Sequence, residues 1–186
     1  MIKNYLTFVV GATNVGKSTT LQAFLKAFPE ETHLIEVGKM LRAKYPPEYF
    51  EGQGAPAKTQ VEALSMLFDG IEAADKAKKR FVFVDGQPRD VEQAVAIQRY
   101  KGNLERTRTC LHLVCPREVR VARAQARDTG KALELSMARM DADILKIHEV
   151  LIAFDECHYE RWNTNHRHYD PAAYWRVFTK VQETQP

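Results

Sequence analysis

An α/β fold, with a parallel sheet covered by helices on both faces, is predicted by three observations. Apolar, strand-like runs alternate with helical patterns along most of the chain, and a glycine-rich loop joins the first such run to the first helix. The 186 residues, of which 45% are hydrophobic, suit one compact domain over residues 1–186. Alternation of this kind favours a parallel sheet whose ligands bind beyond the carboxyl ends of the strands.

The elements are predicted in chain order. Residues 5–10 predict the first strand, and the helix over residues 18–28 is stopped by Pro29. The other predicted elements are a strand over 33–37, a helix through 43, a helix over 57–78, a strand over 81–84, a helix over 90–100, a strand over 109–114 and a helix over 116–127. Residues 45–56, with two prolines and two glycines, predict a long loop.

A phosphate-binding loop is predicted at the end of the first strand. Residues Gly11 to Ser18 read G-A-T-N-V-G-K-S, a complete G-x-x-x-x-G-K-[ST] motif with a strand before it and a helix after it. The glycines let successive backbone N–H groups point at a β-phosphate, Lys17 reaches the β and γ oxygens, and the Ser18 hydroxyl is placed for Mg²⁺. The motif therefore predicts the P-loop NTPase fold and a nucleotide ligand.

An acidic residue ends the next central strand. The run over residues 81–84 is apolar, and Asp85 follows it at the tip. Buried strand ends seldom hold an unpaired carboxylate, so we expect Asp85 to order the water ligands of a Mg²⁺ ion beside Ser18. The alternative is a helix N-cap for the segment that begins near Pro88, but Asp90 suits that role better.

Arginines recur on the last of these predicted helices. Arg120, Arg123 and Arg127 have the three- and four-residue spacing that places side chains on one helix face. A solvated row of like charges is the alternative. Phosphoryl transfer between two phosphorylated substrates gathers negative charge in one cleft, and guanidinium groups bind such oxygens with two hydrogen bonds. We therefore assign Arg123 and Arg127 to phosphate binding.

Composition limits the partners. The formal net charge of +3 arises from 27 basic and 24 acidic residues, so charge alone indicates neither nucleic-acid nor membrane binding. The three cysteines, Cys110, Cys115 and Cys157, lack the spacing of a metal site, and no apolar run approaches bilayer length. We expect a cytoplasmic protein that binds neither nucleic acid nor membrane.

In their order and spacing, these motifs resemble those of the adenylate kinase group of nucleoside monophosphate kinases, over residues 5–143. The family's motifs fall on Gly11 to Thr19 (phosphate loop), on Gly38, Met40, Leu41 and Arg42 (substrate helix), on Asp85 to Arg89 with Gln93 (strand end), on Pro116, Glu118, Arg123 and Arg127 (arginine helix), and on Arg139 and Asp141 (lid). Beyond them the resemblance implies a helix over 141–161, an edge strand near His168 and a helix over 171–182.

The resemblance implies Mg²⁺-dependent transfer of the γ-phosphoryl group of ATP to a nucleoside monophosphate, with AMP or dAMP favoured, by a monomer. It implies an acceptor-binding segment over residues 37–78 and a short lid over residues 128–138 that carries no zinc. The implied catalytic residues are Lys17, Arg89, Arg123, Arg127 and Arg139. The implied ligand-binding residues are Gly11, Asn14, Val15, Gly16, Lys17, Ser18, Thr19 and Arg123 for ATP, Gly38, Arg42, Ala57, Gly86, Arg89 and Gln93 for the acceptor, and Ser18 with Asp85, through water, for the metal.

Several positions depart from the family pattern. Gln87 stands where the family has phenylalanine, which places a hydrogen-bonding group on the wall of the acceptor pocket. Val37 and Lys39 replace a threonine and an aspartate, and Lys39 offers an additional phosphate contact. Lys146 is the candidate for the missing second lid arginine. The Gln93 carboxamide is able to pair with either purine edge, so it does not by itself select adenine.

Two other classes of function explain part of the pattern. A P-loop kinase for another nucleotide or a small-molecule acceptor would use the same loop and Asp85 but would leave the Gln93 match without a purpose. A non-catalytic nucleotide-binding regulator would need the loop, yet it would not need arginines on four separate elements. The kinase hypothesis explains more of these residues than either alternative.

Overall fold

The computed structural model describes residues 4–46, 57–100, 106–154 and 157–165. In these ranges the chain forms a five-stranded parallel sheet in the order β2-β3-β1-β4-β5. The strands are β1 (Asn4–Val10), β2 (Thr32–Glu36), β3 (Phe81–Asp85), β4 (Arg106–Val114) and β5 (His158–Asn163). Because β2 and β3 lie on one side of β1 and β4 and β5 on the other, the carboxyl end of β1 is at the centre of the sheet.

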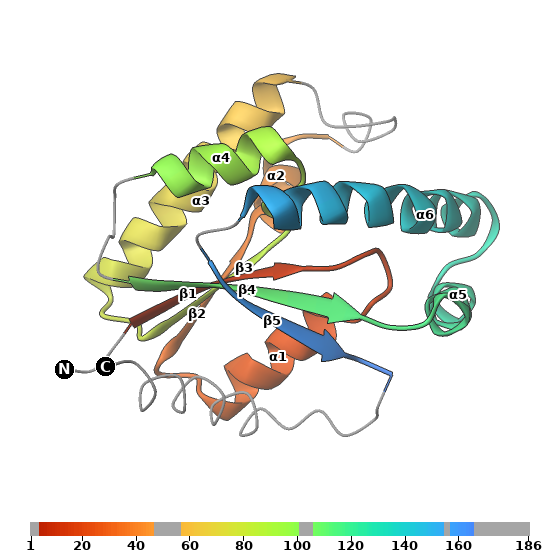
Figure 1. Ribbon diagram of the computed structural model, residues 1–186, viewed down its shortest axis with the longest axis horizontal. Coiled ribbons are helices and arrows are strands. Elements are labelled where there is room, and N and C mark those ends of the chain that lie inside the picture. Colours follow the sequence, from red (N-terminus) through yellow and green to blue (C-terminus); the bar gives the residue numbers. More distant parts are fainter. Residues whose placement is uncertain (1–3, 47–56, 101–105, 155–156, 166–186) are drawn as a thin grey trace.

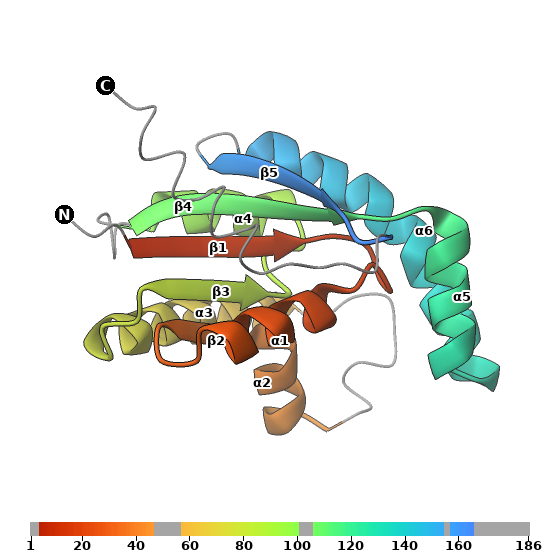
Figure 2. The ribbon, with the colours of Figure 1, turned by 90° about the horizontal axis from the view of Figure 1, so that it is seen from below.

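Helices cover both faces of this sheet, as the sequence predicted. They are α1 (Lys17–Ala27), α2 (Val37–Lys44), α3 (Ala57–Lys76), α4 (Val91–Arg99), α5 (Arg117–Arg127) and α6 (Gly130–Ala153). Helix α1 covers one face, whereas α3, α4 and α6 lie on the other, and α5 lies beyond the carboxyl end of β4 (Figures 1 and 2). None of the helices in the described ranges combines the length and apolarity needed to cross a bilayer.

Alternate side chains of the central strand enter two separate hydrophobic clusters. Leu6, Phe8 and Val10 of β1 pack with residues of α3, α4 and α6, whereas Tyr5 and Val9 pack with residues of α1. Successive side chains of a strand point to opposite faces, so a strand buried on both faces is apolar throughout. This double burial explains why residues 5–10 and 81–84 are continuous apolar runs.

The structure corrects the prediction for the last third of the described chain. Helix α6 begins at Gly130 and ends at Ala153, so the predicted helix over 141–161 is wrong at both ends. Residues 130–138, which the resemblance assigned to a lid, form its first turns, because good helix formers follow Gly130 without interruption. Residues 158–163 form β5 beside β4 instead of helix, and Tyr159 and Trp162 favour this conformation. The elements predicted near His168 and over 171–182 lie outside the described residues.

Candidate functional site

The loop after β1 has the backbone conformation that its glycines predict. Gly11, Asn14 and Gly16 all have positive φ angles, of 156°, 64° and 103°. A Cβ atom on Gly11 would lie 2.7 Å from the carbonyl oxygen of Leu113, so β4 passes too close for any side chain there. Helix α1 begins immediately after the loop at Lys17, and its first N–H groups therefore point toward the space above the loop.

Lys17 lies folded across this loop. Its Nζ atom donates hydrogen bonds to the carbonyl oxygens of Gly11, at 2.6 Å, and of Ala12, at 3.3 Å. Burial lowers the pKa of Lys17, and the negative charges of Asp85 and Asp143 oppose this effect. The ammonium group is thus held among acidic groups at the loop, where a phosphate oxygen would be a stronger acceptor than a carbonyl.

A cavity of about 670 Å³ lies over the loop and the first turns of α1. Most of the predicted ATP-binding residues line it, namely Asn14, Val15, Gly16, Lys17, Ser18, Thr19 and Arg123, and so does Arg127. Gly11 lies in the loop behind them, against β4, and is not part of this lining. The structure therefore brings the loop and the two arginines of α5 to one cavity.

Arg123 connects three segments at the edge of this cavity. Its Nη1 atom donates to the carbonyl oxygen of Val15 at 2.9 Å, and its Nη2 atom donates to the carbonyl oxygen of Thr164 at 2.7 Å. The Thr164 hydroxyl also donates to Val15. Thr164 was not predicted, because it follows β5, beyond the residues that the motifs cover. Arg127 differs from Arg123 in being paired with its neighbour Asp128, at 2.7 Å.

Two arginines from different elements converge beside Gly38. A Cβ atom on Gly38, in α2, would lie 3.4 Å from Nη1 of Arg42 and 3.5 Å from Nη2 of Arg89. The Arg89 Nε atom donates to the carbonyl oxygen of Gly86 at 3.0 Å. Four of the predicted acceptor-binding residues, Gly38, Arg42, Gly86 and Arg89, are therefore in direct proximity. Two neighbouring guanidinium groups form an arrangement suited to a phosphate group.

Four charged groups from three elements act on Arg89. Desolvation lowers the pKa of its guanidinium, which nonetheless stays protonated at neutral pH, as arginine does in proteins. The negative charges of Asp143 and Asp85 raise this pKa, whereas the positive charges of Arg42 and Arg139 lower it. Arg139, in the first half of α6, therefore lies near enough to Arg89 for the two charges to interact, although the Arg139 side chain is exposed.

Asp85 stands between the loop and these arginines. It ends β3, in register with Val9 of β1 and Glu36 of β2. Burial raises the pKa of Asp85, as does the charge of Glu36, whereas Lys17 and Arg89 lower it. Among the described residues no three acidic, histidine or cysteine side chains form a metal cluster. One carboxylate and the Ser18 hydroxyl are a donor set that fits Mg²⁺, which keeps several waters and binds through substrate phosphates.

Helix α6 supplies contacts to the loop that sequence reasoning missed. The Thr13 N–H and hydroxyl both donate to Oδ2 of Asp143, at 2.8 and 2.6 Å, and the Asn14 amide donates to the Ser136 hydroxyl at 2.9 Å. The only sequence signal is the spacing of Asp143, four residues after Arg139, which places both on one face of a helix. That signal gains meaning only once α6 is known to begin at Gly130.

Two glutamines on the acceptor side are buried. Gln93 is 5% exposed, and its carboxamide oxygen accepts a hydrogen bond from the Arg89 N–H at 2.8 Å. This contact fixes the turn that carries Arg89, which is a different role from the predicted reading of a purine edge. Asp90 caps α4 by accepting from the Gln93 N–H, as predicted. Gln87 is 3% exposed, and its carboxamide oxygen has no hydrogen-bond partner among the described residues.

Three further residues singled out in the sequence are Ala57, Lys39 and Lys146. Ala57 begins α3, directly after residues 47–56, which lie outside the described ranges. Lys39 forms an ion pair with Glu36 at 2.7 Å, so the additional phosphate contact offered by Lys39 competes with this pair. Lys146 lies exposed on α6.

Comparison with known proteins gives a partial relative and two similar folds. No family model matches the chain. An adenylate kinase from Wolinella succinogenes is 30% identical over 98 residues, which are 50% of this chain, so the chain spans about half the length (52%) of this curated relative. A protein from Chloroflexus aurantiacus J-10-fl, assigned only provisionally as a kinase, matches with a TM-score of 0.65 at 16% identity, over 100% of both chains. A sugar kinase from Janibacter sp. HTCC2649 matches with a TM-score of 0.62 at 15% identity, over 96% of this chain and 95% of its own. The chain therefore has the α/β fold of P-loop kinases.

Proposed function

We propose that this protein is a nucleoside monophosphate kinase that transfers the γ-phosphoryl group of ATP to AMP or dAMP. The observation that carries the proposal is the convergence of Arg42 and Arg89 beside Gly38, facing the phosphate loop across Asp85. A site that bound one nucleotide would need the loop alone. A second pair of guanidinium groups, held apart from the loop, is suited to the phosphate of an acceptor.

In this proposal, the phosphate loop and the arginine pair beside Gly38 bind different substrates. ATP would lie over the loop, with its phosphates on the N–H groups of residues 16–18 and its remaining charge on Lys17, Arg123 and Arg127. Arg42 and Arg89 would hold the acceptor phosphate so that one of its oxygens faces the γ-phosphorus. That oxygen forms the new P–O bond as the bond to the β–γ bridging oxygen breaks, and ADP leaves with the electron pair.

No side chain needs to form a covalent intermediate in this reaction. Mg²⁺, held by the Ser18 hydroxyl and by waters on Asp85, would supply charge neutralisation at the β- and γ-phosphates. Lys17 and the arginines would stabilise the charge on the transferred group, and Arg139 on α6 adds positive charge on the acceptor side.

A sugar or another small hydroxylated acceptor is the second candidate. Two observations favour it. The carboxamide oxygen of Gln93 is already bonded to the Arg89 backbone N–H. The carboxamide oxygen of Gln87 is buried without a partner among the described residues, which suits a hydroxyl donor on the acceptor. The similarity to a sugar kinase extends over 96% of this chain. The acceptor side, and not the ATP side, therefore decides between the candidates.

One assay separates these proposals. ADP formation from ATP and Mg²⁺ is measured with a panel of ribo- and deoxyribonucleoside monophosphates and, separately, with sugars. We expect turnover with AMP or dAMP and a loss of at least 100-fold in kcat/KM for Arg89→Ala, a change of about 2.7 kcal/mol in transition-state binding. Arg99→Ala, which removes an exposed arginine at the end of helix α4, the helix that follows Arg89, is the matched control.

The outcomes are distinct. Turnover with a sugar alone, lost in Arg89→Ala, would replace the nucleotide acceptor by a sugar. Tight ATP binding without turnover on any member of either panel would show a nucleotide-binding protein that is not a kinase for these acceptors, and would contradict the proposal.

A further inference from the structure

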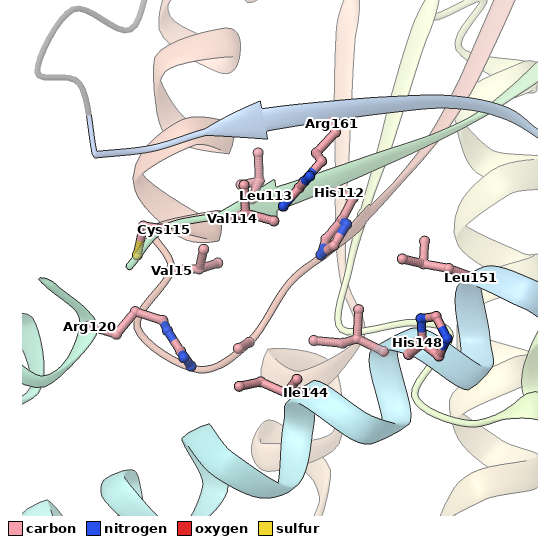
Figure 3. Close-up of a pocket in the computed structure, with 12 residues that line it drawn as sticks. Val15, His112, Leu113, Val114, Cys115, Arg120, Ile144, His148, Leu151 and Arg161 are labelled. Atoms are coloured by element: carbon pink, nitrogen blue, oxygen red, sulfur yellow. The ribbon is translucent and has the colours of Figure 1, made fainter. Parts of the chain in front are cut away.

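A second cavity lies on the other side of the phosphate loop from the cavity over α1, which we propose binds ATP and call the nucleotide cavity. It has a volume of about 320 Å³, opens to the surface and is lined by the loop, the end of β4, Arg120 of α5, β5 and one face of α6 (Figure 3). This volume is at the lower end of the range for small-molecule sites, which is roughly 300–1,000 Å³. Val15 contributes to both cavities, so the loop is the wall between them.

Arg120 is the unusual feature of this cavity. It belongs to the arginine row of α5, but Arg123 and Arg127 line the nucleotide cavity whereas Arg120 lines the second one. Arg120 is 5% exposed, and its guanidinium group extends into the space between the loop and α6 (Figure 3). Its hydrogen bond to the carbonyl oxygen of Met140 is long, at 3.3 Å.

This buried charge has no ion-pair partner in the described ranges. Asp141 is near enough for the charge of Arg120 to lower its pKa, but the Asp141 carboxylate is paired with Arg117 at 3.0 Å. Burying a charged group without a counter-charge is strongly unfavourable. A guanidinium that the fold buries without a carboxylate is therefore a binding group for an anion from outside the chain.

The other polar residues of the cavity favour an anion as well. None of the lining residues is acidic. Arg161 of β5 is the register partner of His112 on β4, and its guanidinium points toward the loop from the wall opposite α6. Burial, together with the charge of Arg161, lowers the pKa of His112 to about 4, so His112 is neutral at pH 7. The positive charge of the site thus comes from two arginines on separate elements.

Apart from Cys115 and His148, the rest of the lining is aliphatic. Ile144, Ile147 and Leu151 present one face of α6 to the cavity, and Ile144 is 47% exposed at its rim. A free phosphate would leave this surface uncovered. An anion with an aliphatic body would place its charged end on the arginines and cover the exposed isoleucine with its chain.

We propose that this cavity is a second ligand site that binds a small aliphatic monocarboxylate. The carboxylate accepts hydrogen bonds from the Arg120 guanidinium group, the Arg161 guanidinium group adds positive charge from the opposite wall, and the aliphatic chain packs on Ile144, Ile147 and Leu151. The site is separate from the phosphate-transfer residues, and it does not depend on which acceptor the enzyme uses.

Hexanoate is a suitable probe, and hexanol is its neutral counterpart of equal length. Binding of each to the full chain is measured by calorimetry in the presence of saturating ADP, so that the phosphate loop is already occupied. We expect the wild-type protein to bind hexanoate and not hexanol. We expect Arg120→Met to bind hexanoate at least tenfold more weakly, and Arg99→Met, which replaces an exposed arginine of α4, to bind it as the wild type does.

The stability of Arg120→Met in the absence of hexanoate tests the role of this residue independently. Since the substitution removes a buried charge that lacks a partner, its melting temperature should equal or exceed that of the wild type. Should Arg120→Met fail to fold, Arg161→Gln at the exposed rim gives the second test, with an expected loss in hexanoate affinity of several-fold. The proposal is overturned by the absence of hexanoate binding, by equal binding of hexanol, or by unchanged affinity in the variants that fold.

Discussion

The buried position of Asp85 lowers the stability of the fold at neutral pH, but it suits a role in binding Mg²⁺. Burial and the neighbouring Glu36 raise its pKa, so the folded protein binds this proton more tightly than the unfolded chain does. As the pH rises from the unfolded pKa through the raised folded pKa, the folded state loses stability relative to the unfolded state. A charged and partly desolvated carboxylate at neutral pH is what a site for Mg²⁺ and its waters requires.

Replacement of Asp85 by asparagine should therefore stabilise the protein while removing its activity. We expect Asp85→Asn to raise the free energy of unfolding at pH 7 by about 1 kcal/mol, the scale of one poorly satisfied buried polar group. The gain should disappear below about pH 3, where the carboxyl group is protonated in both states. Urea unfolding at the two pH values tests this, and a variant less stable than the wild type at pH 7 would contradict it.

Gly11 is constrained by its surroundings as well as by its backbone. Its φ angle is 156°, and an added Cβ would lie 2.7 Å from the Leu113 carbonyl oxygen and 2.9 Å from a methyl carbon of Val15. We expect Gly11→Ala to lower the free energy of unfolding by about 2 kcal/mol, as for a residue forced into a sparsely populated conformation. ATP affinity should fall at least tenfold, because β4 would push the loop out of shape.

Gly130 provides the matched control for this prediction. It also has a positive φ angle, of 54°, but an added Cβ would meet nothing within 4 Å. Gly130→Ala should therefore lower the free energy of unfolding only by the cost of a positive φ angle, about 1 kcal/mol, and should leave ATP affinity unchanged. Equal losses of ATP affinity in the two variants would show that close approach of β4 to the loop is not the cause. Thermal unfolding and nucleotide titration measure both quantities.

Helix α6 acts on the phosphate loop along its length. Asp143 accepts two hydrogen bonds from Thr13, and Ser136 accepts one from Asn14. Met140, which lies between Ser136 and Asp143 in the sequence, is fully buried. The charge of Arg139, on the same helix, lowers the pKa of Arg89. Movement of α6 would therefore affect the phosphate loop and Arg89 together.

Removal of the Asp143 carboxylate should weaken both stability and ATP binding. Asp143→Ala leaves the Thr13 N–H and hydroxyl without their acceptor, which we expect to cost about 2 kcal/mol of unfolding free energy and to raise KM for ATP. Asp141→Ala, two residues earlier on the same helix, breaks only an exposed ion pair with Arg117 and should change neither quantity appreciably. Denaturant unfolding and steady-state kinetics of the two variants test this, and equal behaviour would refute the role of Asp143.

The elements differ in how far sequence predicted them. Strands β1 and β3 were predicted because burial on both faces makes them apolar throughout, and the phosphate loop because glycine is required at fixed positions. Helix α6 and strand β5 were misplaced. The start of α6 at Gly130 depends on helix-forming residues that also suit a mobile lid, and β5 becomes a strand by pairing with β4.

The same distinction applies to the candidate site. Lys17, Asp85, Arg42 and Arg89 were predicted because they lie within motifs or at the carboxyl ends of strands. Asp143 and Thr164 were not, since neither belongs to a motif and each reaches the loop only through the packing of α6 or the end of β5. Arg120 and Arg123 line different cavities. This difference also depends on packing, because their spacing in the sequence places them on one helix face.

Stability and chemistry are concentrated at opposite ends of the sheet. The phosphate loop, Asp85 and the acceptor arginines lie at the carboxyl ends of the strands, whereas Arg106 begins β4 at the other end. Arg106 is 5% exposed, is paired with Asp75 of α3 at 2.6 Å, and donates to the carbonyl oxygens of Tyr5, Lys79 and Arg80. One guanidinium therefore joins the starts of two neighbouring strands to the end of a helix, far from any substrate.

We therefore expect substitution of Arg106 to destabilise the fold without changing catalysis. Arg106→Met should lower the free energy of unfolding by about 3 kcal/mol, as when one partner of a buried ion pair is removed, because Asp75 and three carbonyl oxygens lose their donor. Below the melting temperature, kcat/KM should stay within twofold of the wild type, and the exposed Arg99→Met should match the wild type in both measurements. A large fall in kcat/KM for folded Arg106→Met would show that the two ends of the sheet are coupled, and that the separation of stability from chemistry is wrong.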